Sequence, residues 1–241
     1  MKNEEWLDIP HPRTFACSDE GSWPTAYTMA EALVSWASAK RVPDRIVWAL
    51  YGGDFSRILR QISTSTNGQV NPSSLWNLYQ LVLSTSGPVC EVGVYRGASA
   101  MILARMDPDV WLVDSFEGLS PPIPADAMRA DDGLAHCSHG NFDTSLDEVK
   151  KRLPTANIIK GWVPEALNDL PDKKWGLVHI DLDRAAPTRA AIEYFKDRML
   201  PGGVIVEDQL VSTIYPGPAR AWRESGLEIH VLPTGQGVYF A

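Results

Sequence analysis

Residues 90–100 read CEVGVYRGASA, and this stretch decides the fold class more than any other part of the sequence. Apolar residues surround Glu91, a turn holds Gly93 and Gly97, and helix-forming residues follow from Ala98. Glycines in a strand-to-helix turn let the backbone approach a ligand, and the start of the helix offers free N–H groups. Many α/β proteins need such glycines simply to turn the chain. The turn by itself therefore indicates a structural role as much as a ligand-binding one.

Downstream of this turn, short apolar segments alternate with helical ones, which predicts a parallel sheet covered by helices on both faces. Two short strands near the C-terminus, joined by a turn at 233–236, predict one antiparallel strand at the far side of the sheet. The expected fold is α/β, a doubly wound sheet of the Rossmann-like kind. The expected strands are 89–94, 110–114, 157–160, 176–181, 204–208, 227–232 and 237–240, and the expected helices are 98–106, 145–153, 164–170, 188–199 and about 218–225.

The first third of the chain differs in character, because it carries helical patterns rich in tryptophan and no cluster of chemically capable residues. Its last helix opens after Asn71-Pro72, with Ser73 or Ser74 as the expected N-cap. We therefore expect residues 1–72 to form a helical cap or oligomerisation segment of a homo-oligomer, and residues 73–241 to form the sheet domain.

Composition excludes several classes of protein. The 241 residues are 44% hydrophobic, and 22 basic against 30 acidic side chains give a net charge of −8. That balance disfavours nucleic acid and anionic membranes as partners. No apolar run approaches the roughly 18 residues of a membrane-spanning helix, and the N-terminus shows no apolar signal region. The three scattered cysteines are typical of reduced thiols. We expect a cytoplasmic globular protein with a small-molecule partner.

Two acidic residues at expected strand ends indicate the cofactor. Glu91 would repel a pyrophosphate but attract a cationic sulfonium or ammonium group. Asp114 ends the second strand, where an acidic residue pairs with ribose hydroxyls in doubly wound nucleotide-binding folds. Phe116, two residues further on, could lie against an adenine face. The alternative for Asp114 is a cap on the next turn. Together the two motifs favour S-adenosylmethionine.

A third group of acids follows the fourth and fifth strands. Asp181, Glu207 and Asp208 are expected at the carboxyl edge of neighbouring strands, about 4.8 Å apart, so their oxygens could converge. Three carboxylates repel one another unless a cation or protons intervene. An all-oxygen set favours a hard divalent ion, Mg²⁺ first, and the alternative is a set of solvated strand-end acids.

Six motifs occur in family-like order, and together they resemble the macrocin O-methyltransferase family, metal-dependent class I methyltransferases that act on sugar hydroxyls of natural products. The motifs are 91–99 (EVGVYRGAS), 114–119 (DSFEGL), 160–167 (KGWVPEAL), 179–183 (HIDLD), 201–208 (PGGVIVED) and 215–217 (YPG). The resemblance covers about residues 73–241, and linked motifs make it more specific than any one alone. It implies a class I methyltransferase domain, S-adenosylmethionine as cofactor and a natural-product acceptor.

The resemblance also implies residue roles. Asp181, Glu207 and Asp208 would hold Mg²⁺, and Asp181 would take part in catalysis. His139, in a loop with His136 and Cys137, is a candidate general base in a lid; zinc is the less favoured interpretation of that loop, because a fourth ligand is lacking. The expected cofactor residues are Glu91, Gly93, Tyr95, Gly97, Ser99, Asp114, Ser115, Phe116 and Trp162.

Two departures from the family pattern bear on function. Glu207 and Gln209 stand where the family usually has aspartate and tyrosine, and Arg184-Ala185-Ala186 replace an aromatic wall and an acid. A different acceptor, including an acidic or non-sugar one, is therefore open. So is a catalytically degenerate partner subunit that only binds the cofactor. A nucleotide-dependent oxidoreductase is a further alternative, disfavoured because the first turn lacks a full Gly-x-Gly-x-x-Gly series.

Overall fold

A computed structural model describes residues 53–66, 71–107, 109–126, 142–212 and 214–241 of the chain. Its centre is a seven-stranded sheet with the order β3-β2-β1-β4-β5-β7-β6. β7 pairs antiparallel with both neighbours, and the other strands run parallel, as the sequence predicts. The strands are β1 Val89–Val92, β2 Trp111–Asp114, β3 Asn157–Lys160, β4 Trp175–Ile180, β5 Met199–Glu207, β6 His230–Val231 and β7 Gly237–Phe240.

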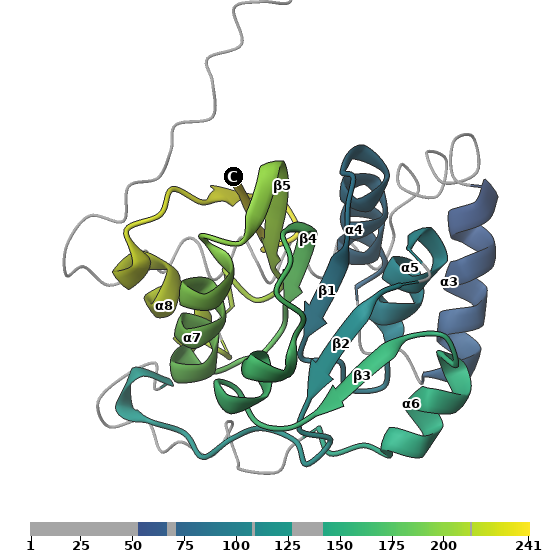
Figure 1. Ribbon diagram of the computed structural model, residues 1–241, viewed down its shortest axis with the longest axis horizontal. Coiled ribbons are helices and arrows are strands. Elements are labelled where there is room, and N and C mark those ends of the chain that lie inside the picture. The colour runs from purple at the N-terminus through teal and green to yellow at the C-terminus, as the bar shows by residue number, and fades with distance from the viewer. Residues whose placement is uncertain (1–52, 67–70, 108, 127–141, 213) are drawn as a thin grey trace, which may run out of the picture.

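Helices cover both faces of this sheet (Figure 1). One face carries α3 Gly53–Ser65, α4 Pro72–Ser84, α5 Ala98–Met106 and α6 Leu146–Arg152, and the other carries α7 Ala185–Phe195 and α8 Gly217–Ser225. Each face has its own hydrophobic core, as expected for a sheet buried on both sides. The predicted doubly wound α/β fold is confirmed.

The strand alternation assigns polar side chains to faces as well. Val204 and Val206 of β5 pack toward the α4 side, whereas Ile205 packs toward α7 and α8. Because successive residues of a strand point to opposite faces, Glu207 follows Ile205 toward α8. In the same way Glu91 of β1 lies beside His179 of β4, its registered neighbour on the parallel strand.

Local details differ from the sequence expectations at three helices. The helix expected at 188–199 is α7, which begins at Ala185 and ends at Phe195, and Met199 begins β5 instead. Asn71, rather than Ser73 or Ser74, caps α4, and its side-chain oxygen accepts a hydrogen bond from the Ser73 amide at 3.0 Å. Pro72 then occupies the first helical turn, where its missing N–H costs nothing. The expected helix at 164–170 is a short 3₁₀ helix, η3 (Glu165–Asp169).

Only the end of the predicted N-terminal segment, residues 1–72, lies within the described residues. There α3 packs its buried Phe55, Ile58 and Ile62 into the same core as α4 and α5. The division at residue 72 and the oligomerisation role stay predictions. None of the helices in the described parts of the chain is long and apolar enough to cross a membrane.

Candidate active site

A cavity of about 500 Å³ opens at the carboxyl ends of β1, β2, β4 and β5, where open α/β sheets bind ligands. Its wall has two parts of different chemistry. The glycine-turn side consists of Gly93, Tyr95, Asp114 and Ser115, and the acid side consists of Asp181, Asp183 and Asp208. Trp162 lines the cavity after β3, and Phe142, Ile214 and Tyr215 add apolar and aromatic surface.

Gly93 brings the two sides together. Its φ of +92° lies in the region that favours glycine, and a Cβ at this position would stand 1.9 Å from the carbonyl oxygen of Asp181. Any side chain would therefore push the end of β1 away from the end of β4. The amide of Gly93 also donates to Val113 at 2.9 Å, which fixes the turn against β2.

Asp114 holds the glycine turn through its carboxylate. Oδ2 accepts hydrogen bonds from the amides of Val94 at 2.6 Å and Tyr95 at 2.9 Å, and Oδ1 accepts from the amide of Phe116 at 2.6 Å. These three hydrogen bonds are those of a turn-capping aspartate, which was the alternative role for Asp114. Two lone pairs on each oxygen leave one acceptor position on Oδ1, and the residue still faces the cavity.

Glu91 lies inside the fold rather than at the cavity. It is fully buried, and its Oε1 lies 2.8 Å from Nδ1 of His179. Burial raises the pKa of Glu91, although His179 and a hydrogen bond from Ser99 oppose that rise. The predicted direct contact of Glu91 with a sulfonium is not supported, because its side chain occupies the α5 side of the sheet.

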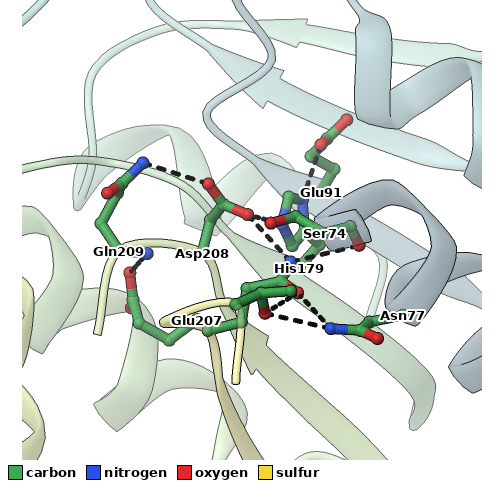
Figure 2. Close-up of polar contacts among 9 residues, drawn as sticks. Ser74, Asn77, Glu91, His179, Glu207, Asp208 and Gln209 are labelled. Carbon is green, nitrogen blue, oxygen red and sulfur yellow. Dashed lines mark hydrogen bonds and ion pairs between the residues drawn. The ribbon is translucent and has the colours of Figure 1, made fainter. Parts of the chain in front are cut away.

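His179 bridges Glu91 to the acid side. It is buried, as expected for a core histidine, and its Nε2 lies 3.7 Å from Oδ1 of Asp208, an ion-pair distance (Figure 2). Burial by itself lowers the pKa of His179, but Asp208 and Glu91 together raise it well above its usual value. The imidazole of His179 thus lies between Glu91 on β1 and the carboxylate of Asp208 at the cavity.

The three carboxylates of the acid side share one environment. Burial and the nearby Asp208 and Asp183 raise the pKa of Asp181 well above its usual range. Burial and Asp208 raise the pKa of Asp183 to about 7. Oδ1 of Asp183 is buried and has no hydrogen-bond partner among the described residues. Its backbone φ of +56° is uncommon for a residue other than glycine and is typical of functional turns.

Glu207 is separated from the other strand-end acids. Its Oε2 accepts a hydrogen bond from Nε1 of Trp222 in α8 at 3.0 Å, and its side chain is fully buried. Burial raises the pKa of Glu207 to about 8. Glu207 and Asp208 are consecutive at the end of β5, so they point to opposite faces and do not share one volume, contrary to the expectation.

Of the three acids expected to bind a divalent metal, two remain as candidate ligands once Glu207 is removed. Within the described ranges, no three His, Cys, Asp or Glu side chains are arranged to hold a metal ion together. Asp181 and Asp208 do face the cavity. Mg²⁺ in proteins usually keeps several waters and takes one or two carboxylates. The oxygen donors present fit such a two-carboxylate site, which is weaker than the three-carboxylate site predicted from the sequence.

The remaining expected cofactor residues divide into two groups. Gly93, Tyr95, Asp114, Ser115 and Trp162 line the cavity, whereas Glu91, Gly97, Ser99 and Phe116 do not. Phe116 is buried in the α5-side core instead of offering an adenine platform. Gly97 caps α5, and Ser99 is buried in the first turn of that helix. His139, His136 and Cys137 lie outside the described residues.

Arg184 was expected from the sequence to offer a positive charge to an acidic acceptor, but its side chain is not available for that contact. It is only 1% exposed, and its Nε donates to the carbonyl of Ser120 at 3.1 Å. The adjacent amide of Ala185 donates to Asp126 at 2.7 Å. This buried arginine fixes the segment after β2 to the start of α7, so it does not support an acidic acceptor.

Comparison with known proteins agrees with this geometry. The family model described as Macrocin-O-methyltransferase (TylF) matches residues 78–225. The chain belongs to the macrocin O-methyltransferase family. A curated relative, 8-demethyl-8-(2,3-dimethoxy-alpha-L-rhamnosyl)-tetracenomycin-C 4'-O-methyltransferase from Streptomyces olivaceus, is 28% identical over 137 residues. That match covers 51% of this chain and 52% of the relative, so the chain spans about half the length of that protein.

Solved structures share the fold at lower sequence identity. The O-methyltransferase NovP aligns with a TM-score of 0.60 and 17% identity, covering 72% of this chain and 81% of NovP. The SAH-bound Podospora anserina methyltransferase PaMTH1 aligns with a TM-score of 0.52 and 13% identity, covering 91% of this chain and 97% of that one. At these identities the likeness shows the fold, the doubly wound sheet of class I O-methyltransferases.

In this member of the macrocin O-methyltransferase family, sequence reasoning missed two polar residues of the site. Asp183 was visible only as part of the motif at 179–183, and its position alone was compatible with a solvated acid as well. Gln236 stood in a turn, and it reaches Asp208 only through the antiparallel pairing of β7 with β5. An acid following a strand-end acid by two residues is the one local signal that indicates Asp183.

Proposed function

We propose that this protein transfers the methyl group of S-adenosylmethionine to a hydroxyl of a sugar carried by a natural product. The observation that carries the proposal is that the glycine-turn side and the acid side line the same cavity and form two parts of its wall. The family assignment supports methyl transfer to oxygen. The curated relative is named as a 4'-O-methyltransferase of a rhamnosyl-bearing tetracenomycin, which supports a sugar acceptor.

The cofactor is proposed to lie against the glycine-turn side. Gly93 has no side chain and lines the cavity, so the polar groups of the cofactor can approach the backbone closely there. The remaining acceptor position on Oδ1 of Asp114 suits a ribose hydroxyl, since Oδ2 is already occupied by Val94 and Tyr95. Trp162 supplies an aromatic surface after β3, where the base of the nucleoside would extend.

The acid side is proposed to receive the acceptor hydroxyl. As its oxygen bonds to the methyl carbon, the carbon–sulfur bond breaks and its electron pair stays on sulfur, giving neutral S-adenosylhomocysteine. The hydroxyl proton passes to a carboxylate, and Asp183 is placed for this role because its buried oxygen has no other partner among the described residues. In-line placement of the two reactants supplies much of the acceleration.

Mg²⁺ belongs to the proposal as a weakly held ion on Asp181 and Asp208. When bound, it would orient the acceptor hydroxyl and lower its pKa. Glu207 is not included among its ligands, because Trp222 occupies that carboxylate on the other face of the sheet. We expect transfer to need millimolar rather than micromolar Mg²⁺, and Asp181→Asn to remove the response while S-adenosylmethionine still binds.

The test is production of S-adenosylhomocysteine with a panel of acceptors: glycosides of aromatic polyketides, the free deoxysugars, and phenols without a sugar. Turnover restricted to sugar-bearing acceptors, lost on EDTA treatment and restored by Mg²⁺, is the expected result. Asp183→Asn should lower kcat at least about 100-fold with an unchanged cofactor Kd, and Asp147→Asn on the exposed face of α6 is the matched control. Transfer to phenols alone would overturn the sugar assignment, and EDTA-resistant transfer would overturn the metal.

A further inference from the structure

The turn between β6 and β7 carries a residue that neither the sequence motifs nor the mechanism above includes. Gln236 is only 1% exposed, although it stands next to the tight turn at Gly235. Burying an amide is unfavourable unless its hydrogen bonds are made. Its partners come from α4, from its own turn and from the end of β5.

All four hydrogen-bonding positions of the Gln236 amide are occupied. Nε2 donates to Oδ1 of Asp208 at 3.0 Å and to the carbonyl of Ser74 at 3.4 Å. Oε1 accepts from Nδ2 of Asn77 at 3.1 Å and from the hydroxyl of Thr234 at 3.0 Å. Asn77 also donates to Thr234 at 3.0 Å, which closes the group.

This pattern fixes which way the amide points. In the reversed orientation, Oε1 would face a carboxylate and a carbonyl, and Nε2 would face the amino group of Asn77. Only the observed orientation satisfies every partner. Gln236 therefore presents one N–H to Asp208 in a defined direction, and α4 holds it there.

Asp208 is held by side chains from three sources. Gln236 approaches Oδ1. His179 approaches the same oxygen, and Nε2 of Gln209 donates to Oδ2 at 3.2 Å (Figure 2). The amide of Asp208 in turn donates to Ile180 at 3.0 Å, which ties its backbone to the end of β4. Carboxylates that hold a ligand or metal depend on such supporting bonds for their orientation.

We propose that Gln236 is a positioning residue: it holds Asp208 in the orientation that methyl transfer requires and connects that carboxylate to α4 through Asn77 and Ser74. The inference rests on the proposed function for its effect on the reaction. The contact between Gln236 and Asp208 stands on the structure alone. A merely structural glutamine would affect folding of the β6–β7 turn without changing turnover at correctly folded sites.

The experiment compares Gln236→Leu and Gln236→Glu with the wild type, and Gln80→Leu on the exposed face of α4 is the matched control. S-adenosylhomocysteine binding measured by calorimetry counts the folded sites. We expect kcat per binding site to fall about 10- to 100-fold in both Gln236 variants, with the Kd for S-adenosylhomocysteine within about twofold of wild type. The Glu variant should be no better than the Leu variant, because it sets a carboxyl group against Asp208.

Asn77→Ala keeps the proposal testable if a Gln236 variant does not fold. It removes one donor that orients the amide, so a smaller fall in kcat is expected, with an unchanged Kd. Unchanged kcat per binding site in every Gln236 and Asn77 variant that folds would overturn the positioning role.

A second readout needs no methyl transfer. The shifts in melting temperature caused by Gln236→Leu and Asp208→Asn should be non-additive when the two are combined. Additive shifts would overturn the contact itself. If the wild type methylates no sugar hydroxyl, the proposed function fails, and these melting temperatures still decide whether Gln236 holds Asp208.

Discussion

The two sides of the cavity are built differently. On the glycine-turn side, the contacts join residues close in sequence or on adjacent strands, and most of them are backbone amides bonded to Asp114. On the acid side, Asp208 is held by side chains that stand 28 or 29 positions away, in Gln236 and His179, as well as by its neighbour Gln209. The contacts of Asp114 on the first side need only β1 and β2 to pair, whereas the second side exists only once β4, β5 and β7 have paired.

The difference teaches where substitutions should act. A change on the glycine-turn side should disturb the path of the backbone, and hence both stability and cofactor affinity. A change on the acid side should disturb the orientation of a carboxylate while the backbone keeps its course. Glu207 belongs to neither side, because it is consecutive with Asp208 but bonded to Trp222 across the sheet.

Gly93→Ala should have the largest effect, because it forces the two sides apart. The new methyl group would overlap the Asp181 carbonyl, and φ at +92° adds backbone strain. We expect a loss of at least about 3 kcal/mol in the free energy of unfolding, measured by urea denaturation.

Gly202→Ala separates the two contributions to that loss. Its φ is +74°, but a Cβ there would meet nothing within 4 Å, so only the cost of strain, about 1 kcal/mol, should remain. Equal losses for the two variants would show that the close approach at Gly93 carries no energy.

Asp114→Ala removes the carboxylate that holds the glycine-turn side and leaves the acid side unchanged. The three backbone amides lose their acceptor, and the proposed ribose contact disappears. We expect the affinity for S-adenosylhomocysteine to fall about 10- to 150-fold, equivalent to about 1.5–3 kcal/mol, in calorimetry. Asp147→Ala on α6 is the control, with no change in Kd. A folded Asp114→Ala protein that keeps the wild-type Kd would remove Asp114 from the cofactor site.

The stability of the protein should depend on pH through Glu207, the strand-end acid that belongs to neither side of the cavity. Its pKa is about 8 in the folded protein and near 4.3 when unfolded, so the folded state binds more protons between these values. Stability should therefore decrease as pH rises, by about 2 kcal/mol from pH 6 to 8. Glu207→Gln cannot titrate, so its decrease from pH 6 to 8 should be about 2 kcal/mol smaller than that of the wild type, in urea unfolding with EDTA present; the raised pKa of Asp183 accounts for a decrease that remains.

Glu228→Gln, at an exposed position before β6, is the control and should keep the wild-type slope. Identical slopes in wild type and Glu207→Gln would mean that Glu207 is ionised in the folded state, as a metal ligand would be.

Much of the fold follows from local pattern. The largely apolar stretches 177–180 (LVHI) and 203–206 (GVIV) predicted buried parallel strands, and the glycine turn predicted the strand-to-helix connection that the structure contains. The N-cap of α4 was misplaced by two or three residues, because the preference of Pro72 for the first turn outweighs the capping preference of serine.

The candidate site followed from the sequence less completely. Strand-end position predicted that Asp114, Asp181 and Asp208 face the cavity, and they do. The same reasoning failed for Glu91 and Glu207, which were treated as strand-end acids whose side chains face the ligand-binding edge. Both are within strands whose alternation directs them to His179 and Trp222.

The sequence by itself determined the doubly wound sheet and the edge at which ligands bind, because periodicity and glycine turns act over a few residues. The family followed from the resemblance carried by the six linked motifs. Tertiary structure alone decided which acids share the cavity and what holds them. That choice depends on strand register and on which face each side chain takes, where a shift of one residue reverses the outcome. Gln236 meets Asp208 for this reason, and Glu207 does not face the cavity for the same one.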